Sequence, residues 1–180
     1  MNILEIYERQ KVLFNSNKTK DIDYRIAQLK KVRQVLKQNE EMLYQAIYAD
    51  FGKSEFETYV TELSFIYHEI KNFIKNLKTW SKRRKVSTDF TNFPAKSYII
   101  PEPLGLSLII GAWNYPYQLS LVPAITSLAA GNTVILKPSE LPSRTSEVMA
   151  KVINNNFQKG LFYVVEGGVE ETTQLLNYHF

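Results

Sequence analysis

Three short apolar runs in the second half of the chain place the strongest constraint on its fold. They are Leu106–Ile110, Thr133–Leu136 and Leu161–Val165, and they begin 27 and then 28 residues apart. This spacing is about the length of a strand, a crossover helix and its loops. Runs that are apolar at nearly every position are typical of strands buried on both faces, as in parallel sheets. We therefore predict an α/β fold with a Rossmann-like parallel sheet that begins after residue 101.

Proline and glycine mark the helices that should connect these strands. Pro116 is suited to the first turn of one helix, and Gly131 can end it. Pro142 can open the next helix, and Gly160 separates that helix from the third strand. The pattern predicts two crossover helices between three parallel strands.

The first eighty residues have helical periodicity instead. Apolar residues recur at steps of three and four from Ile22 to Leu36, and Asp21 is a candidate N-cap. The pattern resumes and stops near Phe51–Gly52, where glycine can end a helix. A further apolar stripe predicts a helix from Glu55 to about Trp80. We expect a helical part over residues 1–82.

Residues 83–100 look like two extended segments joined by a turn, because Ser97–Ile100 is rich in β-formers. The basic run Lys82–Lys85 lies at their start and is a possible footprint of nucleic-acid binding. Four charges without a recognition motif do not make an extended basic face, so we expect no nucleic-acid partner. The division is therefore a helical part (1–82), a hairpin (83–100) and a sheet part (101–180).

The composition excludes several kinds of site. A length of 180 residues with 44% hydrophobic content is enough for a buried core. The chain has no cysteine, which excludes disulfides and thiolate zinc sites, and its histidines, His68 and His179, are far apart in sequence. We expect no metal site. The charged start of the chain resembles neither a secretion signal nor a membrane span, so we expect a cytoplasmic protein that does not enter the membrane.

Two polar residues follow predicted strands directly. Ligands of open parallel sheets bind beyond the carboxyl ends of the strands, and Asn114 and Lys137 lie there. The amide of Asn114 can donate hydrogen bonds to an oxygen that becomes negative during a reaction. Alternatively, Asn114 caps the helix that starts near Pro116, which is a common role of asparagine.

The second position pairs a cation with an acid. Lys137 can reach a nucleotide ribose or phosphate without itself being buried, or it can be an ordinary surface lysine. Glu140 can accept hydrogen bonds from ribose hydroxyls, or it can interact favourably with the dipole of the helix near Pro142. Gly167–Gly168 offers only a weak phosphate-binding signal, because a turn into a helix at Val169–Leu176 explains both glycines.

The strings Ala112-Trp113-Asn114-Tyr115-Pro116 and Lys137-Pro138-Ser139-Glu140 resemble the aldehyde dehydrogenases, especially their class 3-like branch. The resemblance extends more loosely over the whole chain. Ala112 replaces the proline that is common in the family at that position. Family members are more than twice as long, so the chain reads as their N-terminal part.

The resemblance implies a function for each part. In the family, an aldehyde is oxidised to a carboxylic acid through a cysteine thiohemiacetal, and the asparagine matching Asn114 stabilises the oxyanion. Lys137 and Glu140 would bind the adenine ribose of NAD, with NADP possible, although Glu140 would repel a 2′-phosphate. Ile110, Gly111, Ala112 and Trp113 would line the same crevice, and the hairpin would pair subunits into a homo-oligomer.

Because the chain has no thiol, we expect it to be inactive alone. The resemblance also implies that the loop cradling the pyrophosphate follows a further strand, so we expect the chain to bind the cofactor weakly or not at all. A non-enzymatic module that pairs with itself or with a full-length relative is the alternative.

Overall fold

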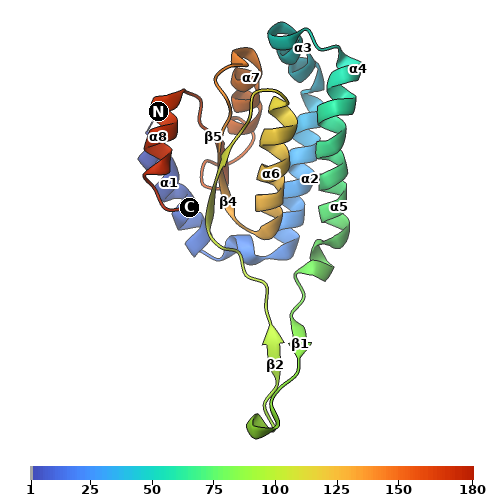
Figure 1. Ribbon diagram of the computed structural model, residues 1–180, viewed down its shortest axis with the longest axis vertical. Coiled ribbons are helices and arrows are strands. Elements are labelled where there is room, and N and C mark those ends of the chain that lie inside the picture. Colours follow the sequence, from blue (N-terminus) through green and yellow to red (C-terminus); the bar gives the residue numbers. More distant parts are fainter. Residues whose placement is uncertain (1) are drawn as a thin grey trace.

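The computed structural model describes residues 2–180, whose strands form two separate sheets (Figure 1). The helices are α1 (Ile3–Asn15), α2 (Ile22–Gln38), α3 (Glu40–Phe51), α4 (Glu55–Thr58), α5 (Ser64–Trp80), α6 (Pro116–Ala130), α7 (Ser143–Asn154) and α8 (Val169–Leu176). The strands are β1 (Arg84–Val86), β2 (Ser97–Ile99), β3 (Leu106–Ile110), β4 (Thr133–Lys137) and β5 (Phe162–Val164). The predicted α/β class is confirmed.

Strands β3, β4 and β5 form a parallel sheet with β4 in the middle. Their bounds agree with the predicted runs to within one residue. The expected burial on both faces holds for β4, which is buried along its whole length. It is wrong for β3, whose residues are half-buried and whose last residue, Ile110, is 52% exposed. β3 lies at one edge of this sheet, and helices cover it less fully than α7 covers β5 at the other edge.

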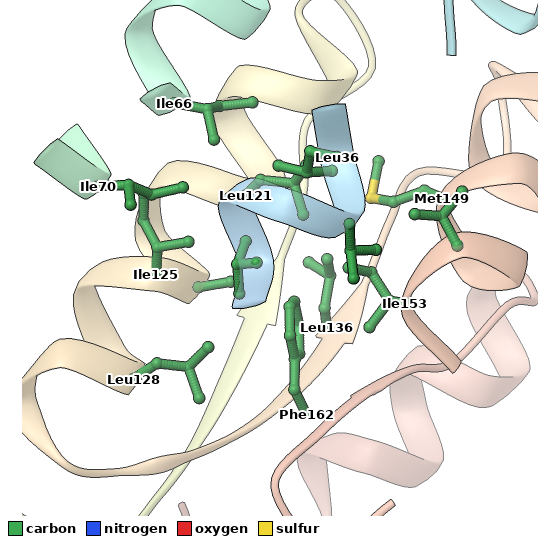
Figure 2. Close-up of a cluster of buried hydrophobic side chains, with 14 of the residues drawn as sticks. Leu36, Ile66, Ile70, Leu121, Ile125, Leu128, Leu136, Met149, Ile153 and Phe162 are labelled. Atoms are coloured by element: carbon green, nitrogen blue, oxygen red, sulfur yellow. The ribbon is translucent and has the colours of Figure 1, made fainter. Parts of the chain in front are cut away.

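Side chains of β4 alternate between two cores, as the pleat of a strand requires. Val134 and Leu136 belong to the larger core, which α2, α5, α6 and α7 complete. Ile135 belongs to a smaller core with residues of α1 and α8 on the other face of the sheet. Figure 2 shows the larger core, in which Leu136 and Phe162 of the sheet lie among helix residues such as Leu121 and Ile153.

Most helix boundaries follow the predicted signals. The carboxylate of Asp21 accepts a hydrogen bond from the Tyr24 amide at 2.6 Å and so caps α2. Helix α3 ends at Gly52, whose φ of 67° is left-handed, and α6 begins at Pro116. Gly131 ends α6 with φ of 97°. Helix α1 has no counterpart among the predicted helices, because its buried face combines only Ile3 and Ile6 with a polar residue, Gln10.

The helix predicted from Glu55 to about Trp80 is interrupted. Residues Tyr59–Leu63 form a π-helical turn between α4 and α5. Such turns are rare and often occur at functional sites. Glu62 lies in this turn and is fully buried.

The predicted hairpin is confirmed by the antiparallel pairing of β1 with β2. It projects from the body of the molecule (Figure 1), and its strand residues are exposed or half-buried.

Candidate functional site at the carboxyl ends of β3 and β4

The carboxyl ends of β3 and β4 meet at the end of the sheet that is remote from the hairpin (Figure 1). Ile110 and Lys137 are register partners, and the Gly111 amide donates to the Lys137 carbonyl at 2.9 Å. The backbone thus joins two of the predicted site segments directly.

Gly111 allows α6 to approach this edge closely. A Cβ atom at this position would overlap the hydroxyl of Ser120 and come within 3.2 Å of the Ser120 Cβ. Pro138 lies on its other side, with its Cα at 3.5 Å. Glycine is therefore needed for packing between the strand ends and the first turns of α6.

Asn114 lies on the exposed loop between β3 and α6. Its backbone carbonyl accepts a hydrogen bond from Lys53 Nζ at 3.2 Å. The alternative that Asn114 caps α6 is wrong, because the Tyr117 and Gln118 amides donate instead to Glu62 Oε2, at 2.7 and 3.3 Å. The Asn114 side chain therefore does not cap α6.

Glu62 and Lys53 were not predicted as part of the site. The two side chains form an ion pair of 2.9 Å in which Glu62 is fully buried and Lys53 is 13% exposed. A sequence signal was present, since Glu62 lies three residues after Tyr59 and four before Ile66, on the apolar stripe. A carboxylate on a buried stripe needs a partner, but the sequence does not say which one.

The expectation that the Lys137 ammonium avoids burial is wrong. Lys137 is only 2% exposed, and its Nζ donates to the Pro138 carbonyl at 2.6 Å. It also lies 3.7 Å from a carboxylate oxygen of Glu140, which is about half exposed. The side chain folds back along the strand end because these oxygens compensate the charge there.

A small pocket of about 160 Å³ lies next to this pair. Its walls come from the loop after β4, the start of α7 and the end of β5: Pro138, Ser139, Glu140, Ser143, Ser146, Glu166 and Gly167. Burial raises the pKa of Glu166, and the nearby Glu147 raises it further. Ile110, Gly111, Ala112 and Trp113 do not line this pocket. Ile110 and Trp113 are instead about half exposed on the β3 side.

The turn at Gly167–Gly168 leads into α8, as the turn interpretation predicted. The Gly168 amide donates to Glu171 Oε2 at 2.7 Å, so a carboxylate of the chain occupies the start of this helix. Asp50 does the same for α7, because its carboxylate accepts from the amide and the hydroxyl of Thr145, both at 2.7 Å. Glu62 accepts hydrogen bonds in the same way at the start of α6. An acidic side chain thus accepts a backbone hydrogen bond at the N-terminus of each of these three helices.

The parallel sheet, the projecting hairpin and the asparagine and lysine strings at the strand ends together match part of an aldehyde dehydrogenase of known structure. The sequence model of the aldehyde dehydrogenase family matches residues 3–179, and the chain belongs to this family.

The relatives of the chain confirm the class 3-like branch of this family. The chain is 44% identical to the 4,4'-diaponeurosporen-aldehyde dehydrogenase of Staphylococcus aureus, over 100% of this chain and 39% of that protein. It is 38% identical to the dimeric NADP-preferring aldehyde dehydrogenase of Canis lupus familiaris, over 99% of this chain and 39% of that protein. A solved structure, the substrate-bound state of Staphylococcus aureus AldH, superposes with a TM-score of 0.94 at 44% identity, covering 99% of this chain and 39% of that one.

The chain thus spans about two fifths of the length of these relatives, 39% in each case. No helix within residues 2–180 is both long enough and apolar enough to cross a lipid bilayer.

Proposed function

We propose that this chain forms part of the nucleotide-binding region of an NAD-linked aldehyde dehydrogenase, which oxidises an aldehyde to a carboxylic acid. Asn114 is the residue that carries this proposal. Its amide is a neutral donor on an exposed loop at the strand ends, and Glu62 has taken over the helix cap that would otherwise explain it.

In this role, Asn114 donates a hydrogen bond to the aldehyde oxygen as negative charge develops on it. A donor of this kind contributes about 3 kcal/mol to transition-state stabilisation. The covalent step of the family mechanism needs a thiolate, and the chain contains no cysteine. The proposed contribution of these residues is therefore binding and oxyanion stabilisation, and the chain alone is inactive.

Lys137 and Glu140 suit the ribose of the cofactor. The Lys137 ammonium lies 3.7 Å from the half-exposed Glu140 carboxylate, so a donor and an acceptor lie together where Glu140 lines the pocket of about 160 Å³. The Ser139 side chain adds a hydroxyl to the same wall. When bound, the nicotinamide part of the cofactor accepts hydride from the substrate.

The acidic lining favours NAD over NADP. Glu140 and Glu166 both line the pocket, and a 2′-phosphate on the ribose would bring negative charge next to them. Ile110, Gly111, Ala112 and Trp113 are proposed to contact the cofactor from the β3 side.

Titration calorimetry of the 180-residue chain tests this function. We expect NAD to bind weakly and NADP more weakly still. Lys137→Ala should lose about tenfold or more in NAD affinity, because it removes a charged hydrogen-bond donor. Lys151→Ala, an exposed lysine on α7, controls for the loss of one positive charge and should bind like the parent chain. Because Lys137 is buried, circular dichroism must show that the Lys137→Ala chain is still folded. Absence of NAD binding in the folded parent chain would refute the proposal.

One observation favours the alternative of an interaction module. Phe90 and Phe93 at the tip of the hairpin are 88% and 79% exposed, and their rings stack with centroids 6.4 Å apart. Exposed aromatic residues of this kind often mark protein interfaces. Tight subunit pairing without NAD binding would support this second function over the first.

A further inference from the structure

The loop that carries Asn114 is held by one buried ion pair from a distant part of the chain. Lys53 lies between α3 and α4, and Glu62 lies in the π-helical turn. The two side chains form an ion pair of 2.9 Å. Glu62 also accepts hydrogen bonds at the start of α6, and Lys53 donates one to the Asn114 carbonyl.

Glu62 uses both of its carboxylate oxygens. Oε2 accepts from the amides of Tyr117 and Gln118, and Oε1 accepts from Lys53. A fully buried carboxylate is stable only when its oxygens are hydrogen-bonded and its charge is compensated. Two amides at a helix N-terminus and one ammonium meet that requirement.

Lys53 also contacts the loop, besides lying 5.3 Å from the centre of the Phe51 ring. Its Nζ donates to the Asn114 carbonyl at 3.2 Å and lies 4.4 Å from the centre of the Tyr115 ring. The Tyr115 ring face attracts a cation at this distance. Lys53 therefore contacts the two loop residues that immediately precede α6.

We propose that Lys53 and Glu62 are positioning residues, which fix the backbone of the Asn114 loop relative to the start of α6. The inference rests on the proposed role of Asn114 in oxyanion stabilisation. A hydrogen-bond donor acts on a developing charge only if its geometry is set before the reaction. The ion pair supplies that constraint from outside the sheet, and the exposed loop cannot supply it alone.

The mobility of Trp113 measures the constraint directly. The chain has two tryptophans, so Trp80→Phe leaves Trp113 as the single reporter next to Asn114. In this background, Lys53→Met keeps the length and apolar stem of the side chain and removes its charge. Nanosecond motion of a tryptophan side chain lowers its fluorescence anisotropy. We expect the anisotropy that Trp113 loses in this way to be about twofold larger in Lys53→Met.

Two further variants separate positioning from general stability. Lys53→Arg keeps the cation and its donors, so it should restore the parent anisotropy decay. Lys20→Met breaks an exposed ion pair with Glu102 elsewhere in the molecule and should leave the decay unchanged. The proposal fails if the folded Lys53→Met chain retains the parent decay, if Lys53→Arg does not rescue it, or if Lys20→Met changes it equally.

Amide hydrogen exchange provides a second measurement at the helix start. Glu62→Gln should speed exchange of the Tyr117 amide about tenfold, since a charged acceptor is replaced by a neutral one. Unchanged exchange in this variant would overturn the role of Glu62. NAD titration of the parent chain judges the proposed function separately, because the loop can be tightly held whether or not the nucleotide binds.

Discussion

Gly111 is the residue at which the strand ends and α6 come closest. Its amide joins β3 to the Lys137 carbonyl, while the space that a side chain would need is filled by Ser120. The Ser120 hydroxyl is itself buried without a hydrogen-bond partner among residues 2–180. Glycine is therefore required at position 111 because a side chain would overlap Ser120, and not because of the glycine backbone conformation.

We expect Gly111→Ala to lower the free energy of unfolding by about 1–3 kcal/mol, because the added methyl group must displace Ser120. Urea denaturation would measure the loss. Combining it with Ser120→Ala should restore part of the stability, since the overlapping hydroxyl is removed. Thr126→Ala, at an exposed position of α6, is the control and should leave the stability nearly unchanged. A Gly111→Ala chain as stable as the parent would contradict the packing argument.

Residues whose neighbours are close in sequence could be predicted, and those held by distant partners could not. The positions of Asn114 and Lys137 at the strand ends followed from the spacing of apolar runs. The burial of Lys137 did not, because it depends on how the following loop folds back. Glu62 and Lys53 reach the site from more than fifty residues away, and only the tertiary structure pairs them with α6.

At the scale of elements, the starts of α6, α7 and α8 share one property. Each receives a carboxylate from the chain, from Glu62, Asp50 and Glu171 respectively. Helix N-termini at the carboxyl edge of a parallel sheet are common phosphate sites. Because they are already filled by acidic groups, we expect anionic parts of a ligand to depend on Lys137 at this edge.

The cap of α8 predicts a pH dependence. Hydrogen bonds from its own backbone amide and from that of Gly168 lower the pKa of Glu171 below its ordinary 4.5. The stability that this carboxylate contributes is therefore fully present above pH 4.5 and is lost as the pH falls through the lower folded pKa. Glu171→Gln should melt at a lower temperature than the parent chain at pH 7, and the difference should shrink towards pH 3.

Thermal unfolding followed by circular dichroism between these pH values is the measurement. Glu170→Gln, at the neighbouring exposed position, is the matched control and should keep the parent profile. A constant difference between Glu171→Gln and the parent across the whole pH range would show that the cap does not titrate as argued.

Element boundaries were predictable where a local signal sets them. Asp21, Gly52, Pro116 and Gly131 act through backbone geometry within one turn, and all four predictions are confirmed. The π-helical turn was not predictable, because an apolar stripe at three- and four-residue steps looks the same with one inserted residue. The half-exposed state of β3 depends on how fully helices cover each edge of the sheet, which composition does not reveal.

On the scale of the whole molecule, exposed apolar residues occur on many elements, and those on the hairpin and near the sheet edge are among the most exposed. Phe90, Phe93, Leu104 and Ile110 are all more than half exposed, and β3 and β5 each pair on one side only within residues 2–180. Open strand edges and apolar patches favour association with another chain.

We expect the 20.9 kDa chain to elute in size-exclusion chromatography as a species larger than a monomer. Replacing Phe90 and Phe93 together by serine should shift elution towards the monomer, because it removes the exposed aromatic tip. Val12→Ser, at a 69% exposed position on α1, is the control and should leave the elution volume unchanged. A monomeric parent chain at dilute concentration would contradict the argument.

The π-helical turn at Tyr59–Leu63 has a consequence for insertions and deletions. An α-helix advances by about 100° per residue, so loss of a single residue in this turn would rotate α5 relative to α4 by roughly that angle. Either the apolar stripe of α5 or the Glu62 carboxylate would then face water. The number of residues in this turn therefore determines which side of α5 faces the core. Its length is constrained as well as its composition.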